Sequence, residues 1–178
     1  VVLGSLNLDL VARCTRLPAP GETVIGSTFD EYPGGKGLNQ AVAAARSSAR
    51  VALIGAVGDD DAGRTLRQVA RGDGIADNDI TTVDNVATGR AIISVDAEAE
   101  NSIIVVPGAN HRVTGPRPPA SRVLLAQLEI PTEAVIEGFR AAKLGGATTV
   151  LNPAPATALS GDLLALTDII IPNEHEVE

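Results

Sequence analysis

The amino-acid sequence predicts an α/β protein in which helices cover a mostly parallel β-sheet. Short apolar runs alternate with longer helical patterns along the 178 residues, which is typical of βαβ units. Hydrophobic residues make up 44% of the chain and are mainly Ala, Val, Leu and Ile, whereas aromatic residues contribute only 2%. Small branched side chains suit a sheet that is buried on both faces. We therefore expect a domain built around a buried parallel sheet.

The first third of the chain is expected to combine a buried strand, two more polar strands and a helix. Residues 1–6 form an apolar run that predicts the buried strand, and residues 9–13 and 23–32 predict the polar strands. A Pro-Ala-Pro-Gly turn separates these two polar strands. Residues 38–48 are rich in alanine, which favours a helix.

The rest of the body is expected to continue as alternating strands and helices. Apolar runs predict strands at 50–57, 123–128, 148–151 and 168–171. Helical patterns predict helices at about 62–71, 131–144 and 160–166, the first of them capped by an aspartate among residues 59–61. Residues 115–119 are rich in Pro and Gly and are expected to form a loop.

The segment at about 89–107 differs from this body. Two β-rich runs, 90–95 and 102–106, flank an acidic stretch, which indicates a hairpin. We expect it to pair with the polar strands at about 9–32 in a small sheet inserted in the body. Such a sheet could act as a lid over ligands bound at the carboxyl ends of the main strands.

Composition excludes several classes of partner. The net charge of −8 argues against a nucleic-acid surface, which needs clustered Lys and Arg. The single cysteine, Cys14, allows no intrachain disulfide and favours a reducing cytoplasm. No apolar run reaches the length of a membrane span. The sequence contains no methionine and stops just after a helix opens, so we expect a piece cut at both ends.

Asn7 and Asp9 follow the first predicted strand. Residues just past the carboxyl ends of strands face the ligand crevice of an open α/β sheet, and residues two apart in an extended segment point to the same side. A carboxylate and an amide could together hold vicinal hydroxyls. Polar residues that simply end a strand are common, and this structural reading is favoured for the pair taken alone.

The stretch Gly34-Gly35-Lys36-Gly37-Leu38-Asn39-Gln40 is the most informative one. Paired glycines let the backbone approach a ligand, and the first N–H groups of the following helix are expected to be free to donate. Lys36 and Asn39 add groups suited to a polyhydroxyl ligand. A P-loop is excluded because Gly37 and Leu38 follow the lysine where Ser or Thr is required, and the dinucleotide-binding GxGxxG pattern of a NAD-binding protein is absent as well.

Polar residues recur where later strands end. Glu129 follows the predicted strand at 123–128, Asn152 follows the next one, and Asn173 and Glu176 follow the last. Each case is weak alone. The repetition indicates one polar ligand site along this edge of the sheet.

These stretches together resemble the ribokinase (PfkB) family of kinases. The resemblance rests on GSLNLD at 4–9, PGET at 20–23, GGKGLNQAVAAA at 34–45, GAVGDD at 55–60, GAN at 108–110, QLEIP at 127–131, LNPAPA at 151–156 and PNE at 172–174. It covers essentially the whole chain, and it is closer to the ribokinase branch than to the fructokinase or adenosine kinase branches.

The resemblance implies a Rossmann-like, three-layer α/β body with a small β-sheet lid that often joins two subunits into a homodimer. It also implies transfer of the γ-phosphoryl group of ATP to a primary hydroxyl of a sugar, O5 of ribose in the ribokinase branch. The implied cofactors are ATP and Mg²⁺, with K⁺ expected in the intact enzyme only.

The family's functional residues carry over onto matching positions. The sugar-binding residues would be Asn7, Leu8, Asp9, Gly35, Lys36, Gly37, Leu38, Asn39 and Glu129. Asn173 would lie beside the ATP phosphates. Glu176 would help to order Mg²⁺ through water.

The family's catalytic base lies in a DTxGAGD motif that these residues do not contain. We therefore expect the chain alone to be inactive. The segment between Asn110 and Val123 is also short where the family usually has a helix. Two alternatives stay open: a truncated, non-catalytic sugar-binding relative, and a nucleoside kinase of the same family.

Overall fold

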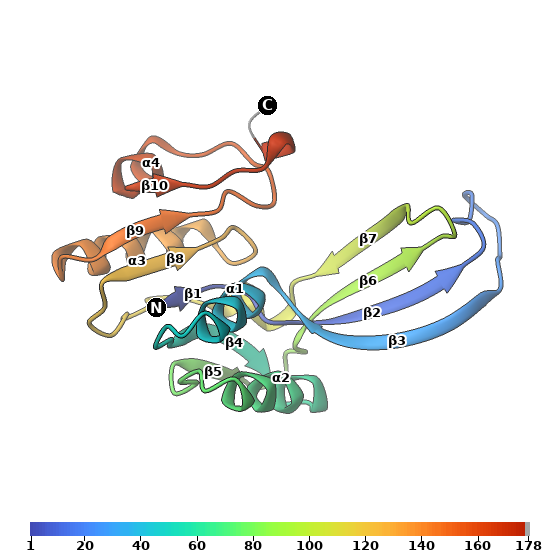
Figure 1. Cartoon of the computed structure of the whole chain (residues 1–178), viewed down its shortest axis with the longest axis horizontal. Helices are drawn as coiled ribbons and strands as arrows, with labels where there is room; N and C mark the ends of the chain where they lie inside the picture. Colours follow the sequence, from blue (N-terminus) through green and yellow to red (C-terminus); the bar gives the residue numbers. More distant parts are fainter. Residues whose placement is uncertain (177–178) are drawn as a thin grey trace.

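The computed structural model describes residues 1–176, in which a six-stranded sheet forms the body and a four-stranded sheet projects from it (Figure 1). The body sheet has the order β10-β9-β8-β1-β4-β5, and all of its pairs are parallel. Its strands are β1 (Val2–Leu3), β4 (Leu53–Gly58), β5 (Ile80–Val83), β8 (Val123–Ala126), β9 (Thr148–Leu151) and β10 (Ile169–Ile170). The predicted parallel α/β body is confirmed.

Helices pack on both faces of this sheet and give the body three layers. They are α1 (Lys36–Arg46), α2 (Asp61–Gly72), α3 (Thr132–Leu144) and α4 (Gly161–Leu166). Successive strand residues point to opposite faces, so Val2 and Leu53 pack in the core that contains Leu38 of α1. Leu3 packs in the other core, which contains Phe139 of α3. The strands are therefore buried from two sides.

The projecting sheet, here called the lid sheet, has the strand order β3-β2-β6-β7. Its strands are β2 (Asn7–Cys14), β3 (Gly26–Gly34), β6 (Gly89–Val95) and β7 (Asn101–Val106). The β2–β3 and β6–β7 pairs are antiparallel, and the parallel β2–β6 pair joins the two halves. The predicted small second sheet is confirmed, and Figure 1 shows it extending away from the body.

Three features differ from the expectation. The predicted first strand is short, because the chain leaves the body at Gly4 and enters the lid sheet at Asn7. The sequence analysis also missed β5 and the short 3₁₀ helix η1 (Gly108–Arg112). Both are short elements without a strong periodic pattern. Within residues 1–176, no helix combines the length and the apolar character needed to cross a bilayer.

Asp168 connects the segment between α4 and β10 to helix α3 and strand β9. Its carboxylate accepts hydrogen bonds from Lys143 Nζ at 2.5 Å and from the N–H and Oγ1 of Thr149 at 2.9 and 3.0 Å. The Lys143 contact, followed by those of Thr149, lowers the pKa of Asp168 from 3.8 to about 2. A carboxylate with a lowered pKa stabilises the fold above its unfolded-state value, and this contribution is lost as the pH falls through the folded-state value.

We therefore expect Asp168→Asn to lower the free energy of unfolding at pH 6, by an amount that shrinks as the pH falls from about 4 towards 2. Urea denaturation of both proteins at several pH values measures this difference. A difference that does not change with pH would contradict the electrostatic origin.

Candidate functional site

Glu129 lies at the centre of the site, just after β8. Its Oε2 accepts hydrogen bonds from Ser5 Oγ at 2.5 Å and from the backbone N–H of Lys36 at 3.1 Å. Ser5 Oγ in turn accepts from the N–H of Gly37 at 3.3 Å, and Ser5 is fully buried. Glu129 therefore joins the end of β1 to the amino end of α1.

The glycine turn, residues 34–39, lies closely against β1. Gly35 has a φ of 87°, in the region that favours glycine. A Cβ on Gly37 would lie 2.5 Å from the backbone nitrogen of Ser5. The turn therefore needs glycine at these two positions, where the backbone segments meet.

The N–H groups at the start of α1 are not free, contrary to the expectation. Those of Lys36 and Gly37 bond to Glu129 and Ser5. Those of Leu38 and Asn39 donate to backbone oxygens of Ser5 and Gly35 at 2.9 Å each. A ligand at this turn must therefore be held mainly by the side chains of Lys36 and Asn39, which are half-buried and exposed, respectively.

Asp9 on β2 faces the glycine turn. A Cβ on Gly34 would lie 2.1 Å from Asp9 Oδ2. Among residues 1–176 the Asp9 carboxylate makes no hydrogen bond or ion pair. Partial burial, and secondly the negative charge of Glu129, raise the pKa of Asp9. Such a carboxylate has unused acceptor capacity and favours a ligand that brings hydrogen-bond donors.

Asn7 lies deeper than expected. Only 3% of it is exposed, and its Oδ1 accepts from Asn110 Nδ2 at 2.8 Å. Asn110 also bonds the N–H and the C=O of Leu6 at 2.9 and 3.1 Å. The sequence analysis noted Asn110 within a motif but gave it no role, because its partners lie more than 100 positions away.

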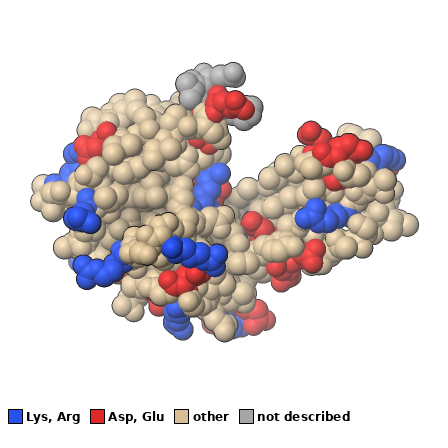
Figure 2. Space-filling model, viewed as in Figure 1, with Lys and Arg blue, Asp and Glu red and all other residues tan. Residues whose placement is uncertain are grey.

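The other predicted sugar residues divide into two groups. Asp9, Gly35, Lys36, Gly37 and Glu129 come together where the lid sheet meets the body, and Asn39 follows in the first turn of α1, where its N–H bonds to the oxygen of Gly35. Figure 2 shows a notch at this junction, and it shows basic side chains spread among acidic ones rather than gathered in one patch on this face. Leu8 and Leu38 are buried, at 9% and 1% exposed, so they can offer a ligand little beyond their main chains.

Asn173 and Glu176 form a compact turn after β10, at the short 3₁₀ helix η2 (Glu174–Glu176). Glu176 Oε2 accepts from the N–H of Asn173 at 2.9 Å, and the N–H of Glu176 donates to Asn173 Oδ1 at 3.0 Å. Asn152 Nδ2 also donates to Glu176 Oε2 at 3.3 Å. No group of three or more His, Cys, Asp or Glu side chains placed to hold a metal ion occurs within residues 1–176.

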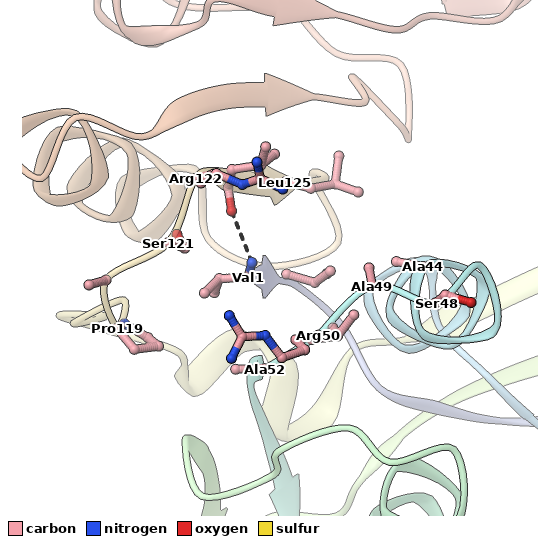
Figure 3. Close-up of a pocket in the computed structure, with 14 residues that line it drawn as sticks. Val1, Ala44, Ser48, Ala49, Arg50, Ala52, Pro119, Ser121, Arg122 and Leu125 are labelled. Carbon is pink, nitrogen blue, oxygen red and sulfur yellow. Dashed lines mark hydrogen bonds between the residues drawn. The ribbon is translucent and has the colours of Figure 1, made fainter.

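A hollow of about 940 Å³ lies elsewhere, at the amino end of β1. Val1, Arg50, Ala52, Pro119 and Arg122 line it (Figure 3). None of the predicted site residues lines this hollow. Ligands of open parallel sheets bind at the opposite, carboxyl edge, so we assign the site to the junction around Glu129. Residues 119–122, at the end of the non-helical segment 113–122, form part of the wall of the hollow.

Comparison with known proteins gives the family. The family described as pfkB family carbohydrate kinase matches residues 1–178. The chain belongs to the pfkB family. Among pfkB-related proteins, the ribokinase of Haemophilus influenzae is 44% identical over 184 residues, covering 99% of this chain and 60% of that protein.

Two further relatives support the assignment to the pfkB family. The bifunctional ribokinase/ribose-5-phosphate isomerase A of Fructilactobacillus sanfranciscensis is 43% identical over 99% of this chain and 34% of its own length. A solved structure of Arabidopsis thaliana ribokinase, complexed with ribose and ATP, superposes with a TM-score of 0.87 at 32% identity, over 99% of this chain and 60% of that one. The chain therefore spans 34–60% of the length of these pfkB relatives.

Proposed function

We propose that this chain carries the sugar-binding part of an ATP-dependent kinase that phosphorylates the primary 5-hydroxyl of D-ribose. The observation that carries this proposal is the Asp9 carboxylate, which has no partner among the described residues and faces the glycine turn beside Glu129. The similarity to proteins named ribokinase, and to a ribokinase solved with ribose and ATP, supports ribose as the sugar.

A polyol fits the charges of this site. Asp9 and Glu129 are two carboxylates close enough for one to raise the pKa of the other, and a sugar offers several hydroxyl donors to such acceptors. Lys36 supplies a compensating positive charge, and Asn39 can donate or accept. Asn7, oriented by Asn110, would present its remaining amide hydrogens to a further hydroxyl.

ATP and Mg²⁺ would occupy the neighbouring turn after β10. Mg²⁺ prefers oxygen ligands, keeps several waters, and is often held by one carboxylate together with substrate phosphates. The donor set fits, because Glu176 supplies a carboxylate and Asn173 an amide. One oxygen of Glu176 is already bonded, which favours contact through water. When bound, Mg²⁺ would neutralise phosphate charge during transfer. K⁺ is proposed only for an enzyme that also contains the family's K⁺-binding segment.

We expect these 178 residues to bind sugar without catalysing transfer, because no aspartate in a DTxGAGD context is present to accept the hydroxyl proton. Calorimetric titration with ribose, adenosine and cytidine, together with an ATP turnover assay, tests both statements. Ribose binding without turnover is expected. Tighter binding of a nucleoside would favour the nucleoside kinase alternative, and turnover would contradict the inactivity. Whether the coding sequence continues to a GAGD-type motif separates an enzyme from a truncated, non-catalytic relative.

We further propose that the lid sheet joins two copies of the protein. Seven large apolar side chains of this sheet are 46–61% exposed: Phe29, Tyr32, Ile92, Ile103, Ile104, Val105 and Val106. Ile92 and Ile104 lie opposite each other in the β6–β7 register, on one face. By the strand register, Phe29, Ile92, Ile104 and Val106 share this face, whereas Tyr32, Ile103 and Val105 lie on the opposite face, which carries Asp9. An apolar face of four such side chains is typical of a protein interface.

A charge at the centre of this surface should weaken self-association. We expect Ile104→Glu to raise the dimer dissociation constant at least about tenfold, because burying an unpaired charge is costly. Ala97→Asp, in the exposed turn between β6 and β7, is the matched control and should leave it unchanged. Sedimentation velocity measures both, and a wild-type protein that stays monomeric would overturn the proposal.

A further inference from the structure

Three side-chain amides form a continuous line of hydrogen bonds between the two halves of the site. Gln127 Nε2 donates to Gln40 Oε1. Gln40 Nε2 donates to Asn152 Oδ1 at 3.1 Å, and Asn152 Nδ2 donates to Glu176 Oε2 at 3.3 Å. We call Gln127, Gln40 and Asn152 the amide relay. It runs from the end of β8, through α1, to the turn at residues 173–176.

The direction of the relay is fixed by its own contacts. Every amide donates towards the carboxylate of Glu176. Turning Gln40 around would set its NH₂ against that of Gln127 and its oxygen against Asn152 Oδ1. Hydrogen bonds aligned in this way polarise and strengthen one another, and the last of them ends on a charge.

Gln127, the first member of the relay, has few alternative hydrogen-bond partners. Gln127 is fully buried, and its Oε1 is the buried side-chain atom without a hydrogen-bond partner among residues 1–176. A Cβ on Gly4 would lie 2.0 Å from this oxygen, so the side chain lies closely against the backbone. A buried acceptor without a partner is costly, whereas the NH₂ group at the other position of this amide is paired with Gln40.

Gln40 lies one turn after Lys36 on α1, directly behind the glycine turn. Its partner Asn152 holds Glu176, and Glu176 holds the N–H of Asn173. We propose that Gln40 is a positioning residue that couples the glycine turn to the turn at residues 173–176, so that sugar binding orders the nucleotide side. The identity of the ligand rests on the proposed function; the coupling in the ligand-free protein does not.

Hydrogen–deuterium exchange of the 178-residue protein tests this coupling. The variants are Gln40→Leu, Asn152→Leu and their double variant. The matched control is Arg46→Gln, which removes an ion pair with Asp73 from the same helix without touching the relay. Without ligand, we expect amides of segment 171–176 to exchange about fivefold faster in Gln40→Leu and Asn152→Leu than in wild type or control. The double variant should exchange no faster than the single ones.

The second part of the experiment repeats the exchange measurement with ribose at a concentration that saturates binding. Ribose should slow exchange of segment 171–176 in wild type and in Arg46→Gln, but not in Gln40→Leu. The relay would be overturned if segment 171–176 exchanged at the same rate in wild type and in Gln40→Leu without ligand. It would also be overturned if the fold-increase in exchange rate of the double variant equalled the product of the fold-increases of the two single variants. If wild type binds no ribose in calorimetry, the proposed function fails, and the ligand-free arm alone decides the relay.

Discussion

Asp9→Asn is expected to abolish ribose binding while making the ligand-free protein more stable at neutral pH. The carboxylate would accept sugar hydroxyls with both oxygens, whereas an amide offers one acceptor and no charge. Hydrogen bonds to charged groups are the stronger class, so we expect the affinity for ribose to fall at least about a hundredfold.

The gain in stability follows from the raised pKa of Asp9. Burial, and then the charge of Glu129, favour the protonated form in the folded protein. Such a group contributes stability below its ordinary pKa of 3.8, and this contribution is lost as the pH rises through the raised folded-state value. The ionised Asp9 therefore costs stability at pH 7, and an uncharged asparagine avoids that cost.

Urea denaturation at pH 7 and near pH 3, with ribose titration at pH 7, measures both effects. The stabilisation should be present at pH 7 and absent near pH 3. Glu31→Gln, which removes another lid-sheet carboxylate at an exposed position next to Tyr32, should leave ribose affinity unchanged. A stable Asp9→Asn protein that binds ribose like wild type would remove Asp9 from the site.

Much of the fold could be predicted because its signals are local. The apolar runs and the alanine-rich helix are patterns within a few residues, and they marked the parallel body and the helices on it. The lid sheet was also predictable, because the hairpin at 89–107 and the polar strands near the amino terminus differ in character from the body. The short strand β5 was not predicted, because four residues carry little periodic signal.

The site was less predictable because its contacts are distant in sequence. Glu129 bonds the N–H of Lys36 across 93 positions, and Asn110 bonds Asn7 across 103. A glycine-rich helix start suggested free N–H groups, yet Ser5 and Glu129 already occupy them. The sequence analysis missed the amide relay for the same reason. Gln40, Gln127 and Asn152 belong to separate parts of the sequence, and only the folded chain brings them together.

Gly37→Ala is expected to be the most destabilising single change at the site. The backbones of β1 and α1 approach so closely that a Cβ on Gly37 would lie 2.5 Å from the carbonyl carbon of Gly4 and from the nitrogen of Ser5. Because these are backbone atoms, no side chain can move aside. Separating the two segments would also stretch the bonds from Ser5 to Gly37 and to Glu129.

We expect Gly37→Ala to lower the free energy of unfolding by about 3 kcal/mol, the upper end of the usual range for overpacking, and to remove ribose binding with it. Gly72→Ala is the matched control, because a Cβ there meets nothing within 4 Å at the end of α2. That change should be neutral or stabilise by up to about 1 kcal/mol. Urea denaturation and calorimetry compare the two variants. Equal stability of the two would show that β1 and α1 can separate freely, and that the glycine turn is not held in place by Glu129 and Ser5.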